Sequence, residues 1–274
     1  MTTPTEPAGA KTGPTYGTYL RLDDLLGAQT TLTDAHDELQ FIIVHQTFEL
    51  WFKLMLFEAV AARAAMHAGR AAEAVHYLRR LNEIVKVLTT SFNVIETMRP
   101  YDFLEFRSEL QPASGFQSVQ FRELEFVCGV RDERYAKLVE RPDQVARLRQ
   151  RMAEPSVWDA YLELLRRHGL PTDDDPTIVK SIIVILKARD DHALGELTET
   201  LIEYDELFAL WRQRHVRMAM RMIGAKPGTG AQTVKKLEEG GYGQFGPGGV
   251  DYLKSTLPKQ FFPLLWEART FIER

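Results

Sequence analysis

The chain has 274 residues, of which 45% are hydrophobic and 26% are charged, a composition typical of a soluble globular protein. Its length suits one large domain or two small ones. The 34 basic and 38 acidic side chains give a net charge of −4, and this near balance argues against nucleic-acid or anionic-membrane partners. No apolar run approaches the ~20 residues that span a bilayer. Residues 1–15 are predicted to form a disordered tail without the apolar core of a signal peptide, so a cytoplasmic protein is expected.

Cysteine is nearly absent, because Cys128 is the single one in the chain. One cysteine excludes an intrachain disulfide, a multi-cysteine zinc site and a four-cysteine iron–sulfur cluster. No C-x-x-C-H motif offers thioether attachment of haem. Cys128 follows Phe126 and Val127 and is interpreted as a small packed hydrophobic side chain.

Helical patterns follow one another from Tyr16 to the end of the chain, and strand signals are nearly absent. The β-branched run Ile182–Ile185 is interpreted as a buried helix turn. Breaks are expected at Gly69 and Pro100. The predicted helices lie at about 20–26, 37–66, 71–97, 102–110 with Asp102 as its cap, 116–127, 177–190, 194–223 and 250–255, with two exposed helices inside 132–170. The class is therefore all-α, with a bundle core.

One domain is expected over residues 16–274, with a small helical insertion at 132–170. Residues 224–249 are rich in glycine and are predicted to be irregular. Such a segment could close over a site, or it could be a solvated linker.

Two of the seven histidines, His45 and His215, interrupt otherwise apolar helix faces. The apolar residues that flank them at helical spacing are Phe41, Phe48, Phe52, Phe208, Trp211, Met218 and Met222. Such a face can present an imidazole to a flat apolar cofactor, or it can bury one hydrogen-bonded structural histidine. The other five histidines lie among polar or small residues and are expected at the surface or, for His36, at a helix start.

The choice of metal can be narrowed from the sequence. Zinc or non-haem iron needs about three protein ligands, but H-E-x-x-H does not occur, and Glu49 is the acid nearest His45 on its helix face. Haem needs one proximal imidazole, an apolar slot and a distal group. The two histidines therefore favour haem, although a stripe of methionine and aromatic residues is also typical of a plain core.

Two further features could bind an anion. Arg107 follows Phe103 and Phe106, and a guanidinium among apolar neighbours is costly unless it meets an anion such as a carboxylate. The alternative is an ion pair with a nearby acid such as Asp102. Ser114 precedes a helix start, where donors can face an anion, or where the hydroxyl simply caps the helix.

Seven segments of this chain together resemble the tryptophan 2,3-dioxygenase family. They occur in the family's order and are YGTYL (16–20), HDELQFIIVHQTFELWFK (36–53), DFLEFR (102–107), PASGFQSVQFR (112–122), LWRQRHV (210–216), MIGAKPGTG (222–230) and FFPLLWEART (261–270). The resemblance implies a helical homotetramer with one non-covalent haem b per subunit. It also implies an enzyme that uses O₂ to open the indole 2,3 bond of L-tryptophan, giving N-formyl-L-kynurenine.

The resemblance also implies roles for individual residues. His215 would be the proximal ligand of the haem iron, His45 would accept the indole N–H, and Arg107 would bind the substrate carboxylate. The other implied site residues are Trp211 beside His215, Ser114 near the haem, Phe41 and Phe103 around the indole, Thr229 at the ammonium or carboxylate, and Tyr16 and Tyr19 from a neighbouring subunit.

The chain departs from the family pattern after Thr229, where Ala231–Gln232–Thr233 and a longer glycine-rich stretch replace a short turn. This departure motivates an alternative, a haem monooxygenase of the same superfamily that acts on a substituted tryptophan and gives an oxindole-type product. Two alternatives of other classes are a haem sensor or carrier without turnover and a haem-free helical scaffold.

Overall fold

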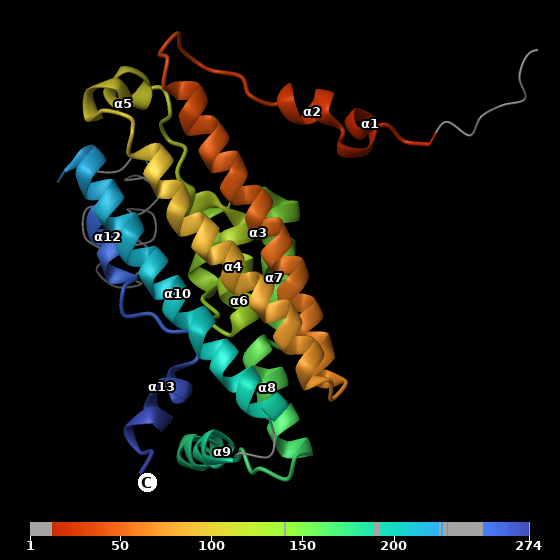
Figure 1. Cartoon of the computed structure of the whole chain (residues 1–274). Helices are drawn as coiled ribbons and strands as arrows, with labels where there is room; N and C mark the ends of the chain where they lie inside the picture. The colour runs from red at the N-terminus through yellow and green to blue at the C-terminus, as the bar shows by residue number, and fades with distance from the viewer. Residues whose placement is uncertain are drawn as a thin grey trace, which may run out of the picture.

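The computed structural model describes residues 13–139, 141–188, 192–224, 226, 229 and 249–273. Every regular element in these residues is helical, which confirms the predicted all-α class (Figure 1). The α-helices are α1 (Tyr16–Leu20), α2 (Leu22–Leu26), α3 (Glu38–His67), α4 (Ala71–Ile95), α5 (Pro100–Arg107), α6 (Val119–Cys128), α7 (Pro142–Ala153), α8 (Val157–Arg167), α9 (Asp175–Lys187), α10 (His192–Ile223), α12 (Val250–Ser255) and α13 (Pro263–Thr270). Two 3₁₀ helices, η1 (Gly115–Gln117) and η2 (Glu133–Leu138), complete them. No helix in these ranges is long and apolar enough to cross a membrane.

Three long helices, α3, α4 and α10, form the centre of the molecule (Figure 1). α3 and α4 are joined by a tight turn at Gly69, whose φ of 76° favours glycine, and they run antiparallel. The buried side chains of all three helices, among them Met55 of α3, Leu78 of α4 and Leu201 of α10, belong to one continuous core. This core fixes the three helices relative to one another.

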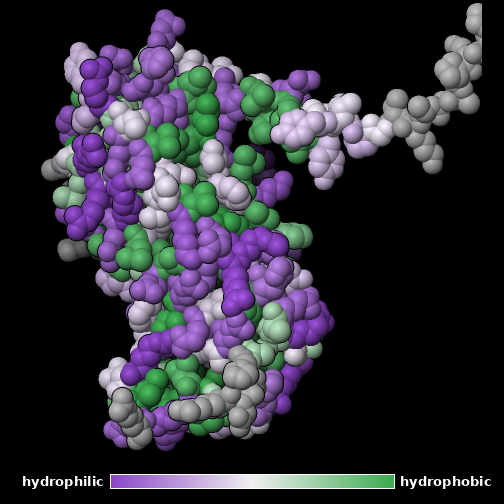
Figure 2. All heavy atoms as spheres, viewed as in Figure 1, coloured by the Kyte–Doolittle hydropathy of each residue, from purple (hydrophilic) through white to green (hydrophobic). Residues whose placement is uncertain are grey.

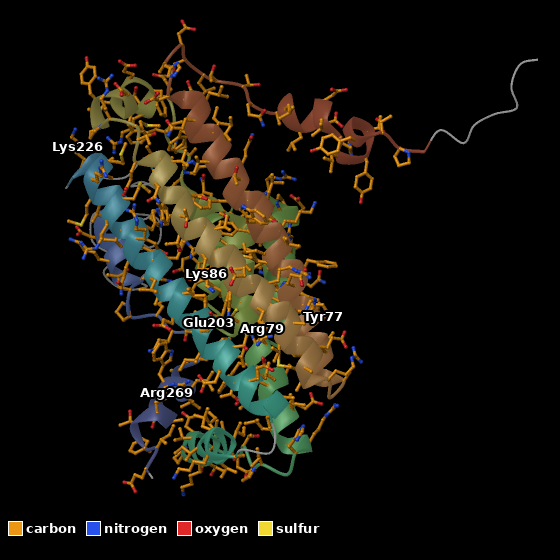
Figure 3. The ribbon with its side chains drawn as sticks, viewed as in Figure 1. Tyr77, Arg79, Lys86, Glu203, Lys226 and Arg269 are labelled. Atoms are coloured by element: carbon orange, nitrogen blue, oxygen red, sulfur yellow. The ribbon has the colours of Figure 1, made fainter. Side chains whose placement is uncertain are left out.

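α4 and α10 lie side by side and run in the same direction, because polar pairs join them in increasing residue order. Arg79 pairs with Glu196, Lys86 Nζ lies 3.3 Å from Glu203, and Arg214 pairs with Glu96. Figure 3 shows Arg79 and Lys86 on α4 close to Glu203 on α10. These pairs fix the position of α10 along α4, and therefore the position of His215 along the bundle.

The structure corrects two local predictions. Asp102 does not cap α5, because the helix begins at Pro100 and the Asp102 carboxylate instead accepts two hydrogen bonds from Arg99, of 2.7 and 2.8 Å. The helices within 132–170 were predicted to be exposed, which is wrong for α8. Tyr161 and Leu164 of α8 are fully buried in the main core.

Other local predictions are confirmed. The Ile182–Ile185 run is helical, within α9, and Cys128 is a buried free thiol in the main core. The tail is described only from Gly13, and the segment 231–248, which holds most of the predicted glycine-rich loop, lies outside the described residues.

The N-terminal helices α1 and α2 form an arm, residues 13–27, that extends away from the bundle (Figure 1). Apolar side chains on the arm and on the adjoining face of α3, including Leu26, Leu39 and Leu50, are exposed, and Figure 2 shows hydrophobic patches there. The arm joins the bundle where the Gln46 side-chain amide of α3 donates to the Ala28 carbonyl, at 3.1 Å. A second hydrogen bond, from Gln29 Nε2 to Gln46 Oε1 at 2.6 Å, reinforces this junction.

Asp205 ties the C-terminal segment to α10. This buried carboxylate accepts hydrogen bonds from the backbone N–H groups of Phe261 and Phe262, at 2.9 and 3.1 Å, and from Trp266 Nε1 at 3.0 Å. We expect Asp205→Ala to lower the free energy of unfolding by about 3 kcal/mol, because three buried donors lose their acceptor. Chemical denaturation measures this loss.

A matched control lies on the same pair of helices. Glu199 of α10 pairs with Arg269 of α13 at 2.7 Å, but the Glu199 side chain is 59% exposed. Glu199→Ala should change the unfolding free energy by less than about 1 kcal/mol. Equal effects of the two variants would contradict the anchoring role of Asp205.

Candidate active site

A cavity of about 890 Å³ opens between α2, α3, α4, α5, α6, α10 and α12. Eight of the ten site residues predicted from the sequence line it, and they come from five separate parts of the chain. These eight are Phe41, His45, Phe103, Arg107, Ser114, Trp211, His215 and Thr229. The structure thus brings together residues that are far apart in the sequence.

His45 lies on the wall that α3 contributes to the cavity. Its Nδ1 lies 2.7 Å from the carbonyl oxygen of Phe41, one helical turn earlier. Because a carbonyl can only accept, Nδ1 must carry the proton in this contact, and Nε2 of the neutral ring is then an acceptor. Burial lowers the pKa of His45, while the Phe41 carbonyl and the negative charge of Glu49 oppose that decrease. The neutral form therefore prevails near pH 7.

His215 lies on the α10 wall among aromatic rings. Phe92 stacks on its imidazole at 5.4 Å between ring centroids, and Trp211 lies at 5.3 Å. Burial lowers the pKa of His215 to about 4, and the His45 ring across the cavity contributes to the decrease. The neutral imidazole is the form that binds a metal.

The two histidines fit a haem better than a smaller metal site. Within the described part of the chain, no three His, Cys, Asp or Glu side chains are grouped so as to hold a metal ion. No hydrogen bond to the His215 ring occurs among the same residues, so the alternative of a hydrogen-bonded structural histidine lacks its partner. The cavity walls near both rings are apolar, with Phe48, Phe92 and Met218 among them. One free imidazole on an apolar slot meets the needs of a haem.

Phe41 and Phe103 form the aromatic end of the cavity, where their ring centroids are 5.7 Å apart. Arg107, at the end of α5, lines the same end. Asp102, one of the acids considered as a partner of Arg107, pairs with Arg99 instead. A guanidinium beside an aromatic wall suits a ligand that carries both a carboxylate and a flat ring.

Ser114 and Thr229 also border the cavity. The Ser114 hydroxyl accepts the Phe116 N–H at 3.4 Å and forms a capping box with Gln117. The helix-cap interpretation of Ser114 is therefore confirmed, and it holds this segment at the cavity edge. Thr229 follows α10, which ends at Ile223, directly before Gly224 with its φ of 61°.

Tyr16 and Tyr19 do not reach this cavity. Both lie on α1 of the arm, and their side chains are 76% and 75% exposed. The structure therefore does not place them in the site formed by their own chain.

Sequence reasoning missed a buried charged cluster at the α6 and α12 end of the cavity. Arg122 donates to Glu125 Oε2 at 2.7 Å and to the Tyr252 hydroxyl at 3.3 Å, while its guanidinium stacks over Tyr135 at 3.8 Å. Arg212 lies 3.7 Å from the same Glu125. The spacing of Arg122 and Glu125 by three positions on one helix was the available sign of this pair. Glu125 thus joins α6 to α10 through a buried ion pair.

In this all-helical fold, one cavity is lined by two imidazoles, aromatic side chains and an arginine. These features define a class of small-molecule site that suits a flat cofactor and an aromatic acid. A family model described as tryptophan 2,3-dioxygenase matches residues 3–178. The tryptophan 2,3-dioxygenase of a Nocardioides species is 46% identical, over 93% of this chain and 94% of its own length. Those of Caulobacter vibrioides and Anaeromyxobacter dehalogenans are each 38% identical, over 93% and 97% of this chain and 97% and 98% of their own lengths. The chain belongs to the tryptophan 2,3-dioxygenase family.

Proposed function

We propose that this protein is a tryptophan 2,3-dioxygenase, an oxidoreductase that uses O₂ to open the indole ring of L-tryptophan and releases N-formyl-L-kynurenine. The observation that carries this proposal is the similarity to relatives of that name along nearly the whole chain. The cavity supports it, because the residues expected to bind an indole amino acid lie together in it.

The cofactor we propose is haem b, with His215 as the axial ligand of its iron. The low pKa and aromatic surroundings of His215 support this role, because they keep the imidazole neutral and in one orientation. Trp211 would pack beside the ligand, and Ser114 would lie at the cofactor's edge. When bound, haem supplies the O₂-activating chemistry that no side chain can provide.

The proposed substrate pose uses both ends of L-tryptophan. Arg107 binds the carboxylate, and Thr229 contacts the ammonium or carboxylate. Phe41 and Phe103, whose rings stack on each other, form one aromatic surface against which the indole packs. His45 Nε2 accepts the indole N–H, as its tautomer allows. These contacts would hold the ring in one place and exclude water, which is the contribution a protein makes to cofactor chemistry.

We further propose a homotetramer of single-domain subunits spanning residues 16–274, with 224–249 as the loop beside the site. The exposed arm supports this assembly, because Tyr16, Tyr19 and Leu26 expose apolar surface that a second copy could cover. In that assembly the two tyrosines would complete a neighbouring subunit's site.

Product analysis tests the proposed function. Reduced protein supplied with haem, L-tryptophan and ¹⁸O₂ should form a product heavier than tryptophan by two labelled oxygen atoms, with the near-ultraviolet absorbance of N-formylkynurenine. A gain of one oxygen atom, from tryptophan or a methylated tryptophan, would favour the monooxygenase alternative instead. Haem binding without any product would favour a sensor or carrier.

A further inference from the structure

Glu49 lies on α3 one helical turn after His45 and lines the same cavity. Its carboxylate accepts hydrogen bonds from the Ser118 hydroxyl at 2.6 Å and from Gln120 Nε2 at 2.8 Å. Gln120 Nε2 also lies 2.8 Å from the Glu49 carbonyl oxygen. Ser118 in turn caps α6 by accepting the Phe121 N–H at 3.2 Å. Glu49 therefore joins the helix that carries His45 to the start of α6.

The charge of Glu49 is not neutralised by these contacts. Its two side-chain partners are a hydroxyl and an amide, and it forms no ion pair within the part of the chain that the structure describes. A carboxylate near an imidazole favours proton binding to that ring and strengthens it as a hydrogen-bond acceptor. Consistent with this, the charge of Glu49 raises the pKa of His45 against the effect of burial.

Other charged or titratable groups also line the cavity, on several helices. They are Lys53 on α3, Arg107 on α5, Arg122 and Glu125 on α6, Arg212 and His215 on α10, and Tyr252 on α12. Arg122, Arg212 and Lys259 lie around Glu125 in the buried cluster. Glu49 is the acid that acts on His45.

We propose that Glu49 is a positioning residue for substrate recognition: held by Ser118 and Gln120, it keeps His45 in place and strengthens His45 Nε2 as the acceptor of the indole N–H. This inference rests on the proposed function, since it assumes that His45 receives that N–H. It adds the influence of a nearby charge to a histidine whose hydrogen-bond partner is the Phe41 carbonyl.

Glu49→Gln tests the proposal, because it keeps the shape of the side chain and removes its charge. The Michaelis constant for L-tryptophan near pH 7 should rise roughly threefold to tenfold, the range expected for weakening one hydrogen bond. The inhibition constant of 1-methyl-L-tryptophan, which has no indole N–H, should stay the same. An equal change for both compounds would mean that Glu49 acts only on the shape of the cavity, and would overturn the proposal.

The pH dependence of kcat/KM is a second test, because a purely structural role of Glu49 would not change it. Tryptophan binding is lost on the acid side as His45 takes up a proton and can no longer accept. Without the Glu49 charge, the pKa of His45 falls, so the acid limb of kcat/KM should move to lower pH. Glu49→Asp and Ser118→Ala both retain the charge and should leave the acid limb where the wild type has it.

The ring titration of His45 separates this inference from the proposed function. Nuclear magnetic resonance of ring-labelled histidine should show His45 titrating at lower pH in Glu49→Gln, whether or not the protein turns over tryptophan. An unchanged titration in a protein that forms N-formylkynurenine would reject the role of Glu49 alone. A shifted titration in a protein without that activity would reject the proposed function and leave the Glu49–His45 coupling standing.

Discussion

His215→Ala is expected to remove the Soret absorbance of protein supplied with haem. The imidazole is the side chain in the cavity best suited to hold the iron, because burial keeps it neutral and Phe92 and Trp211 fix its ring. Turnover of tryptophan should fall by more than the ~100-fold that follows from losing an outer partner of a metal ligand. Absorption spectra during haem titration measure the first effect directly.

His45→Ala is the matched control, since it removes the imidazole on the opposite wall. That variant should keep its Soret band and lose substrate affinity. If His215→Ala bound haem with an unaltered spectrum, the proposed axial ligand would be wrong.

Arg107→Leu is expected to raise the Michaelis constant for L-tryptophan by about 30- to 1000-fold. The reason is that a buried carboxylate without its guanidinium loses about 2–4 kcal/mol, and each 1.4 kcal/mol is a tenfold change. Steady-state kinetics at constant haem occupancy measures this change.

Two comparisons make the Arg107 prediction specific. Arg99→Leu changes a surface arginine of the same α5 region, whose partner is Asp102, and should leave the Michaelis constant near the wild-type value. Tryptamine has no carboxylate, so its inhibition constant should be similar in wild type and Arg107→Leu. A loss of affinity that is equal for tryptophan and tryptamine would exclude a carboxylate-binding role.

Most helix limits could be predicted because their signals are local. Gly69 with its positive φ ends the turn between α3 and α4, and Pro100 starts α5. Asp102 shows where such reasoning fails. Its position in the first turn resembles a cap, but an ion pair with Arg99, three residues before it, competes for the same carboxylate.

Burial could not be predicted where one helix has two different faces. α8 carries Glu163, Arg166 and Arg167 on its outer side, which favoured an exposed helix. Its other side, with Tyr161 and Leu164, packs fully into the core. Which face meets the bundle depends on α3, a distant part of the sequence.

Eight of the ten predicted site residues lie together in one cavity, but the contacts that support them were not predicted. His45, Arg107 and His215 carry residue types that are unusual on apolar helix faces, so each was visible alone. The bonds from Ser118 and Gln120 to Glu49 cross some 70 positions of the chain, and no local pattern reports them. No local sequence pattern indicated the direction of the arm or the exposure of Tyr16 and Tyr19 either.

The distance in sequence between α10 and the α3–α4 hairpin has a consequence for biosynthesis. The walls that carry His45 and His215 lie on helices separated by more than half of the chain, and contacts that distant form late in folding. A ribosome has completed the α3–α4 hairpin long before α10 emerges, so the nascent chain exposes the apolar surface of α4 that α10 later covers. On the proposed function, haem could bind only after α10 has been synthesised, because α10 carries the proposed axial ligand.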